Sequence, residues 1–248
     1  MGYTSKKYSD SKVKKTKTMQ SLKNRLLNEA IETGSGIVQP STIEELDKEI
    51  RKRLRKHQTD LNDIDTSRIT DMSNLFVDIK LSQNIDISQW DVSNVRDMHN
   101  MFNGCKKFNC DLSGWDVSHV ENMDSMFFDC LEFNSDLSRW DVSNVKDMSA
   151  MFANCNNFNS DLSKWDVSRV EYMTAMFSFC KKFDSDLSRW DVSRVKMMSD
   201  MFVGCDKFDC DLSKWNVGNK VVTYGMFDRS GVKEIPSWYK EPDFYNFK

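Results

Sequence analysis

The stretch "SKWDVSRVEYMTAMFSFC" occupies residues 163–180, and the chain repeats it closely on both sides. Twenty-five residues earlier the sequence reads "SRWDVSNVKDMSAMFANC", and twenty-five residues later it reads "SRWDVSRVKMMSDMFVGC". The same step separates six tryptophans, at positions 90, 115, 140, 165, 190 and 215. A fixed period of about 20–30 residues is typical of solenoids, in which each repeat is one coil stacked on the last.

Three other residue types keep the same 25-residue step. They are Phe102, Phe127, Phe152, Phe177, Phe202 and Phe227; Met98, Met123, Met148, Met173 and Met198; and Cys105, Cys130, Cys155, Cys180 and Cys205. Stacking in register would set equivalent residues about 5 Å apart. Each buried large aromatic removes roughly 200 Å² from water, which is worth up to about 5 kcal/mol. We therefore interpret the repetition as a core that one copy cannot bury alone, and not as a copied chemical site.

Within one repeat the apolar residues follow two successive spacings, first that of a strand and then that of a helix. The end of "DLSKWDVS" (161–168) alternates apolar and polar residues, as a short strand does. Ser168 then has the spacing of a helix cap, with Glu171 completing a capping box. Val170, Met173, Met176 and Phe177 follow on one helical face. The sequence therefore predicts an α/β repeat solenoid of the leucine-rich-repeat type, right-handed, with one short strand and one short helix per 25-residue coil.

Caps are expected at both ends of the repeats, because terminal coils need a polar outer face. Ser41 or Thr42 can begin an amphipathic helix that runs to about His57, with acids in its first turn and bases in its last. The predicted divisions are a basic tail at 1–35, a helical cap at 36–64, about six coils at 65–215 and a C-terminal cap at 216–248.

Charge is unevenly distributed along the chain. Residues 1–35 hold eight Lys and Arg against three Asp and Glu, a balance of +5, so the net charge of −3 leaves −8 for residues 36–248. An acidic body disfavours specific binding of nucleic acid, which needs a basic footprint. No run of about 20 apolar residues predicts a membrane span, and the N-terminus lacks the apolar segment of a signal peptide. These features predict a cytoplasmic protein, with a cell surface or virion as the alternative.

The basic tail has two interpretations. Residues 1–18 are polar and basic, a composition typical of disorder. Residues 19–31 outline a short amphipathic helix before the flexible joint "ETGSG". The segment is either a solvated tail with a transient helix or a docking helix that attaches the repeats to another protein or to an acidic surface. A targeting peptide is a third alternative.

The repeat motif points to a known family. The spacing C-x2-F-x3-L-x2-W-x-V-x2-V-x2-M-x2-M-F-x2-C, complete from Cys130 to Cys155, resembles that of the BspA-like leucine-rich-repeat proteins. These are bacterial and phage-borne proteins commonly named surface proteins. The resemblance extends from 36 to 240. It implies a curved, non-catalytic binding scaffold without an agreed ligand. Two departures occur, one inserted residue near 77–82 and the loss of the Asp and Ser columns after Trp215.

Residue types that carry chemistry are present without the grouping that catalysis needs. The three histidines join no nucleophile and acid in a recognisable order, and no Gly-rich phosphate loop occurs. The seven cysteines contain no C-x2-C pair, which favours buried thiols over a metal site. Two regular Asp columns are interpreted as structural or solubility features, with partner recognition or calcium as alternatives. We expect no enzyme activity, cofactor or metal.

Irregular outward positions are where a repeat scaffold can carry specificity. Four bulky apolar residues replace small or polar ones in their columns: Phe128, Tyr172, Phe179 and Met197. Such exposed patches often bind proteins, although local packing between coils is the alternative. A second candidate is the expected strand face, with Arg139, Lys164 and Arg189 beside Asp141, Asp166 and Asp191. The predicted function is non-catalytic protein binding or scaffolding, with an adhesin on a cell surface or virion as the alternative.

Overall fold

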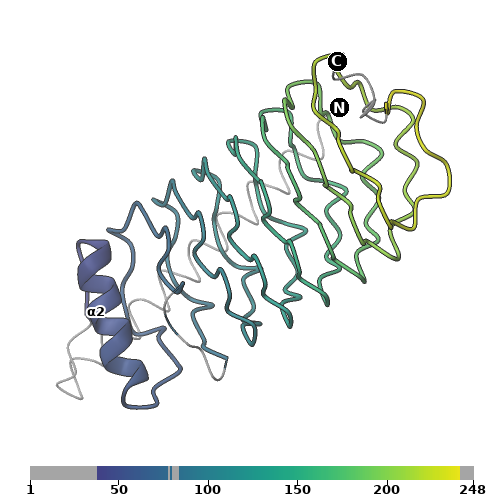
Figure 1. Ribbon diagram of the computed structural model, residues 1–248. Coiled ribbons are helices and arrows are strands. Elements are labelled where there is room, and N and C mark those ends of the chain that lie inside the picture. The colour runs from purple at the N-terminus through teal and green to yellow at the C-terminus, as the bar shows by residue number, and fades with distance from the viewer. Residues whose placement is uncertain (1–37, 78, 80–83, 241–248) are drawn as a thin grey trace, which may run out of the picture.

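The computed structural model describes residues 38–77, 79 and 84–240. In this part the chain winds into successive turns that stack along one axis, from the only described helix, α2, to the last turn near residue 240 (Figure 1). The predicted tail at 1–35, including the docking segment at 19–31, lies outside the described residues.

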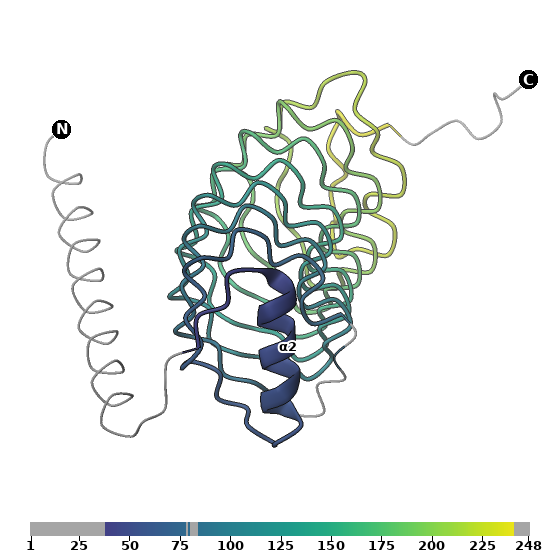
Figure 2. The ribbon, with the colours of Figure 1, turned by 90° about the vertical axis from the view of Figure 1, so that its left-hand side faces the viewer.

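Helix α2 spans Ile43–Leu54 and closes the N-terminal end of the stack. The Thr42 hydroxyl accepts a hydrogen bond from the Glu45 backbone N–H, as an N-cap residue should. Leu46 and Ile50 are fully buried, while Figure 2 shows the helix lying across the first turn. The predicted helix is therefore confirmed, ending three residues before His57.

The short helix expected in each repeat is not formed, because α2 is the only helix among the described residues. The chain instead makes a series of β-turns, and apolar residues occupy the first and fourth positions of these turns. In the opening stretch the closing N–H groups belong to Trp165, Val170, Met176 and Cys180, and each bonds to the carbonyl three residues before it, at 2.9–3.2 Å. A spacing of i and i+3 fits a helix face and a chain of β-turns equally well, which explains the wrong prediction.

Pairing between turns also differs from the expected strand. The described residues contain isolated parallel bridges rather than strands. Six of the eight form one ladder, which from Asp97 onward lies seven residues after each tryptophan of the 25-residue series, not at "WDVS". This ladder runs Asp71, Asp97, Asn122, Asp147, Tyr172, Met197 and Val222. From each bridge, alternate N–H groups donate to the following turn: Met173 to Met197, Ala175 to Ser199, Phe177 to Met201 and Phe179 to Val203. The segment expected to be helical therefore pairs with its neighbours. The predicted capping box is also wrong, because the Glu171 N–H donates to Lys146 of the preceding turn.

Aromatic rows fill the interior of the stack. The rings of Trp165 and Trp190 lie 6.5 Å apart at 3°, and those of Phe152 and Phe177 lie 5.8 Å apart at 9°. The Trp165 Nε1 donates to the Leu137 carbonyl of the preceding turn at 3.0 Å. The Trp165 indole thus packs on the following turn and donates to the backbone of the preceding one, so the repeated residues join the turns to one another.

Two positions in most turns hold the left-handed backbone conformation that favours glycine. The first includes Ala150 and Ala175, at φ 49° and 54°, and the second includes Phe179 at φ 59°. For an L-residue other than glycine, this conformation costs about 1–2 kcal/mol of conformational free energy. Neighbouring turns must therefore hold these residues in place.

Ala175→Gly is expected to raise the free energy of unfolding by about 0.5–1 kcal/mol, because glycine adopts the left-handed conformation without steric cost. Ala153→Gly is the matched control: Ala153 is buried and lies outside the positive-φ residues, so this change should destabilise by about 1 kcal/mol. Urea unfolding of both variants measures the two changes. Equal destabilisation by both would contradict the left-handed assignment.

Candidate functional site

The bridge ladder changes from polar to apolar toward the C-terminal end. Its first members are Asp or Asn, and its last three are Tyr172, Met197 and Val222. Parallel bridges join Tyr172 to Met197 and Met197 to Val222, so the three residues lie on adjacent turns. Met197 is 40% exposed and Val222 45% exposed, values that are high for large apolar side chains. We call this set, together with Tyr224, the apolar row.

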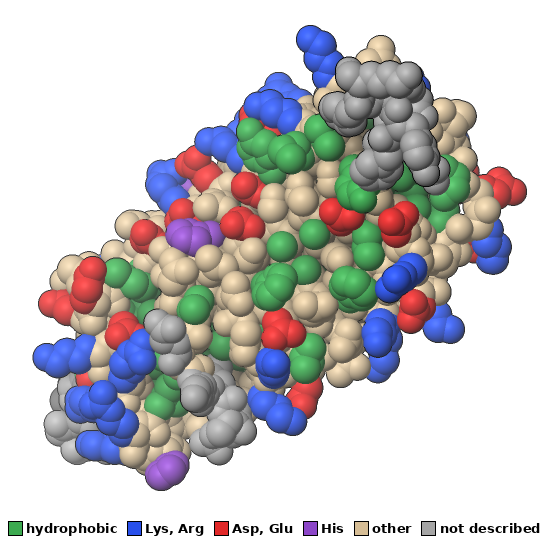
Figure 3. Space-filling view, viewed as in Figure 1, with side chains coloured by type: hydrophobic (Ala, Val, Ile, Leu, Met, Phe, Trp, Pro, Cys, Tyr) green, Lys and Arg blue, Asp and Glu red, His purple; other side chains and the backbone are tan. Residues whose placement is uncertain are grey.

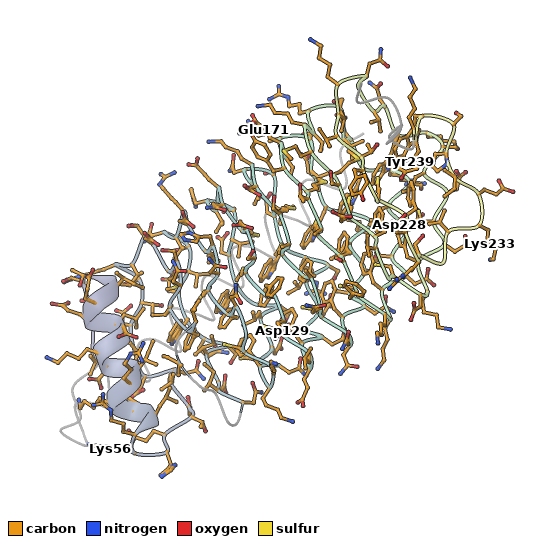
Figure 4. The ribbon with its side chains drawn as sticks, viewed as in Figure 1. Lys56, Asp129, Glu171, Asp228, Lys233 and Tyr239 are labelled. Atoms are coloured by element: carbon orange, nitrogen blue, oxygen red, sulfur yellow. The ribbon has the colours of Figure 1, made fainter. Side chains whose placement is uncertain are left out.

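Tyr224 and a lysine border the row. Tyr224 follows Val222 by two residues and is 45% exposed. The Lys196 ammonium lies 5.6 Å from the Tyr172 ring centroid and also pairs with the Glu171 carboxylate. Figure 3 shows hydrophobic side chains gathered toward the C-terminal end with Lys and Arg beside them, and Figure 4 places Glu171 along the same long edge. The row is therefore an apolar surface with a cationic margin.

A pocket of about 300 Å³ opens beside the end of the row. Val222, Tyr224 and Trp238 supply its large apolar walls, and Lys240 is the charged residue of its lining. The Trp238 ring stacks on Trp215 at 6.1 Å, and its Nε1 donates to the Leu212 carbonyl at 2.8 Å. The last turn thus positions an aromatic wall next to exposed apolar side chains.

The other two predicted apolar residues have different surroundings. Phe179 is 40% exposed and covers Gly204 of the next turn, where a Cβ would lie 2.6 Å from the Phe179 ring. Glycine at 204 is therefore required by this close approach. Phe128 is half-buried, and its carbonyl accepts a hydrogen bond from the Gly104 N–H. The structure brings Tyr172 and Met197 together, while Phe179 packs against its own neighbouring turn.

The cationic candidates form a row of their own. Arg139, Lys164 and Arg189 are exposed and occupy one β-turn position on successive turns. No carboxylate of the described residues lies within salt-bridge distance of them. Their binding role stays a prediction.

The acids of that face bind their own backbone. The Asp141 carboxylate accepts hydrogen bonds from the Ser143 N–H and hydroxyl, at 3.2 and 2.6 Å. Asp166 and Asp191 accept from the N–H two residues later, at 3.0 Å each. Hydrogen bonds from Ser193 hold the pKa of Asp191 below its ordinary value. These carboxylates stabilise β-turns, as Asp side chains commonly do.

The cysteines are free thiols, buried in the core except for the half-buried Cys210. The Cys155 Sγ donates to the Phe127 carbonyl at 2.9 Å, and Cys180 does the same to Phe152. Burial raises the pKa of Cys105 and Cys205 to about 12, and raises the pKa of Cys155 and Cys180 well above the ordinary range. A protonated, buried thiol is a poor nucleophile.

Two features are absent from the described residues. No group of three or more His, Cys, Asp or Glu side chains converges there as metal ligands would. No helix of this part of the chain has the length and apolar character needed to cross a bilayer.

Sequence reasoning missed part of the site. Val222 is the next member of the column that holds Tyr172 and Met197, so adding one more 25-residue step would have found it. Tyr224 continues the column of His99 in the same way. Trp238 follows Trp215 by 23 residues, which hides its place in the tryptophan row.

Comparison with known proteins adds one finding. A family model described as "Mycoplasma protein of unknown function, DUF285" matches the chain at residues 45–156 and again at 132–238. The two matches together span 45–238, well over half of the 248 residues. No curated protein and no solved structure matches the chain.

Proposed function

The chain belongs to the family described as Mycoplasma protein of unknown function, DUF285, and from that premise we propose that it is a non-catalytic protein-binding module. We assign it the leucine-rich-repeat-like solenoid class and, within the family, the BspA-like type. The stacked 25-residue turns and the motif between Cys130 and Cys155 support this assignment.

The apolar row is the observation that carries the proposal. The half-buried Tyr172 and the exposed Met197 and Val222 replace the acids and amides of the same ladder, on consecutive turns at one end of the stack. Contiguous apolar surface is costly in water, and in soluble proteins it marks a site of interaction with another protein. Tyr and Met are also enriched where proteins bind one another, since they supply a large contact area.

The roles of the chemical side chains favour binding over catalysis. The Asp columns are occupied in β-turn hydrogen bonds, as at Asp141 and Asp166. The thiols of Cys155 and Cys180 are buried with raised pKa values. The buried thiols lack the access to a substrate that a nucleophile needs, and the exposed carboxylates already accept hydrogen bonds from their own β-turns.

Met197→Asp combined with Val222→Asp is expected to weaken binding of a protein partner at least tenfold, since each carboxylate would be desolvated against an apolar surface. Partners are captured with the full chain from a lysate of its own cells, and the affinity of the purified partner is then measured by calorimetry. Val77→Asp is the matched control, because Val77 is equally exposed, at 40%, and lies at the other end of the stack.

Unchanged affinity of every captured partner for the double variant would contradict the proposal. So would equal weakening by Val77→Asp, because a general loss of stability or a change of net charge would then explain the effect. Circular dichroism of both variants monitors folding.

A further inference from the structure

Within the described part of the chain, the last turn of the stack ends in an open hydrogen-bonding edge. In the preceding turn, four alternate N–H groups donate to carbonyls of the last turn: Met198 to Val222, Asp200 to Tyr224, Phe202 to Met226 and Gly204 to Asp228, at 2.8–2.9 Å. The same pattern joins the earlier turns, for example from Met148 to Tyr172 and from Phe152 to Met176. Each inner turn thus uses these donors to hold the next one.

The four equivalent donors of the last turn have no acceptor among residues 38–77, 79 and 84–240. They are the backbone N–H groups of Thr223, Gly225, Phe227 and Arg229, and none of them donates a hydrogen bond within the described structure. A strand added beyond the last turn would supply acceptors for these donors, as each inner turn receives its acceptors from the next one.

The opposite end of the stack is closed. Helix α2 lies across the first turn, and Val38 forms a parallel bridge with Ile64 (Figure 2). The contrast shows that the open edge is a feature of one end and not of the repeat itself. Open edges of this kind template the addition of another strand.

We propose that this edge binds an extended segment of a partner protein, which adds to the stack as one more parallel rung. The inference rests on the proposed function and adds that the bound segment of the partner is extended. Carbonyls of alternate partner residues would accept from the four free donors, and the backbone contacts would supply affinity, as in other cases of strand addition.

The surroundings of the edge define the chemistry of the segment. Val222, Tyr224 and Trp238 line the adjoining pocket, so apolar side chains of the segment would fill it. Lys220 and Lys240 are exposed beside that pocket, and no carboxylate of the described residues lies within salt-bridge distance of either. The edge therefore fits an apolar segment that carries a carboxylate near its N-terminal end.

A synthetic peptide with the sequence of residues 169–178, RVEYMTAMFS, is a suitable probe, because this segment forms such a rung inside the stack and carries Glu171 near its start. Amide exchange of the full chain is followed by NMR. Without peptide, the four free amides should exchange quickly, while those of Met198, Asp200, Phe202 and Gly204 stay protected. Added peptide should slow the exchange of the four amides at least tenfold.

Thr223→Pro tests the backbone contact directly, since it removes an N–H that the described protein does not use. It should weaken peptide binding several-fold, whereas Thr223→Ala keeps the N–H and should bind as the unchanged chain does. Equal binding by the proline variant would overturn the proposal.

Two further outcomes would overturn it. Protection of the four amides in the free protein would show that the chain itself or a second copy already occupies the edge, and fast exchange in saturating peptide would show that no rung is added. A third outcome separates this inference from the proposed function. If a partner binds the unchanged chain but not the Met197→Asp, Val222→Asp variant, and the four amides still exchange quickly in its complex, the apolar row is a docking surface and only the added rung is wrong.

Discussion

Replacing Trp165 by alanine is expected to lower the free energy of unfolding by about 3–5 kcal/mol, the usual cost of truncating a buried tryptophan. The Trp165 side chain is 4% exposed and lies in the middle of the stack. Its ring contacts Trp190 at 6.5 Å and Phe152 at 6.3 Å. Truncation would open a cavity between neighbouring turns, and the rigid backbone ladder on both sides limits how far they can collapse into it.

Two variants separate the contributions at this position. Trp165→Phe retains an aromatic ring and leaves the Leu137 carbonyl without its Nε1 donor, so it should cost about 1–3 kcal/mol. Lys164→Ala alters an exposed neighbour and should change stability by less than about 0.5 kcal/mol. Urea unfolding at pH 7 measures all three variants. A loss below about 1 kcal/mol for Trp165→Ala would contradict a continuous tryptophan row.

The sequence predicted which residues pack together but not the backbone that holds them. Equal spacing of Trp, Phe, Met and Cys implies stacked rows under almost any conformation of the coil, because only the period matters. The choice between helix and β-turns depends on backbone angles, and Ala175 and Phe179 at positive φ carry no signal of that kind in their residue type. Gly204, in the same column as Phe179, was the visible hint.

The candidate site was predicted in part for a similar reason. Tyr172 and Met197 differ by 25 residues, so their contact followed from the period once the columns were aligned. Phe179 was grouped with them by residue type alone, and a glycine on the next turn explains its place instead. The open edge at Thr223 and Gly225 has no counterpart in residue type, since every turn carries the same donors and only the position in the stack leaves them unused.

Alkaline pH is expected to destabilise the protein steeply through its thiols. Burial raises the folded-state pKa of Cys105 and Cys205 to about 12, and raises that of Cys130, Cys155 and Cys180 well above 9, the ordinary value that the unfolded chain restores. A raised folded pKa gives a contribution that is complete below pH 9 and is lost as pH rises toward the folded value. Each buried thiol should therefore cost about 2 kcal/mol by pH 10.5.

The double variant Cys155→Ser, Cys180→Ser isolates this effect, because serine keeps a hydroxyl donor for the Phe127 and Phe152 carbonyls and does not ionise in this range. Between pH 8 and pH 10.5 its unfolding free energy should fall by about 4 kcal/mol less than that of the unchanged chain. Lysine and tyrosine titrations are common to both proteins and cancel in the difference. Cys210→Ser removes one thiol whose pKa is also raised, to about 11, so it should give about half the difference of the double variant. Urea unfolding under reducing conditions measures the free energy of unfolding of each protein against pH. If the curves of the double variant and the unchanged chain ran parallel, water would reach the cysteine column, and the packing of the Phe rows against it would be wrong.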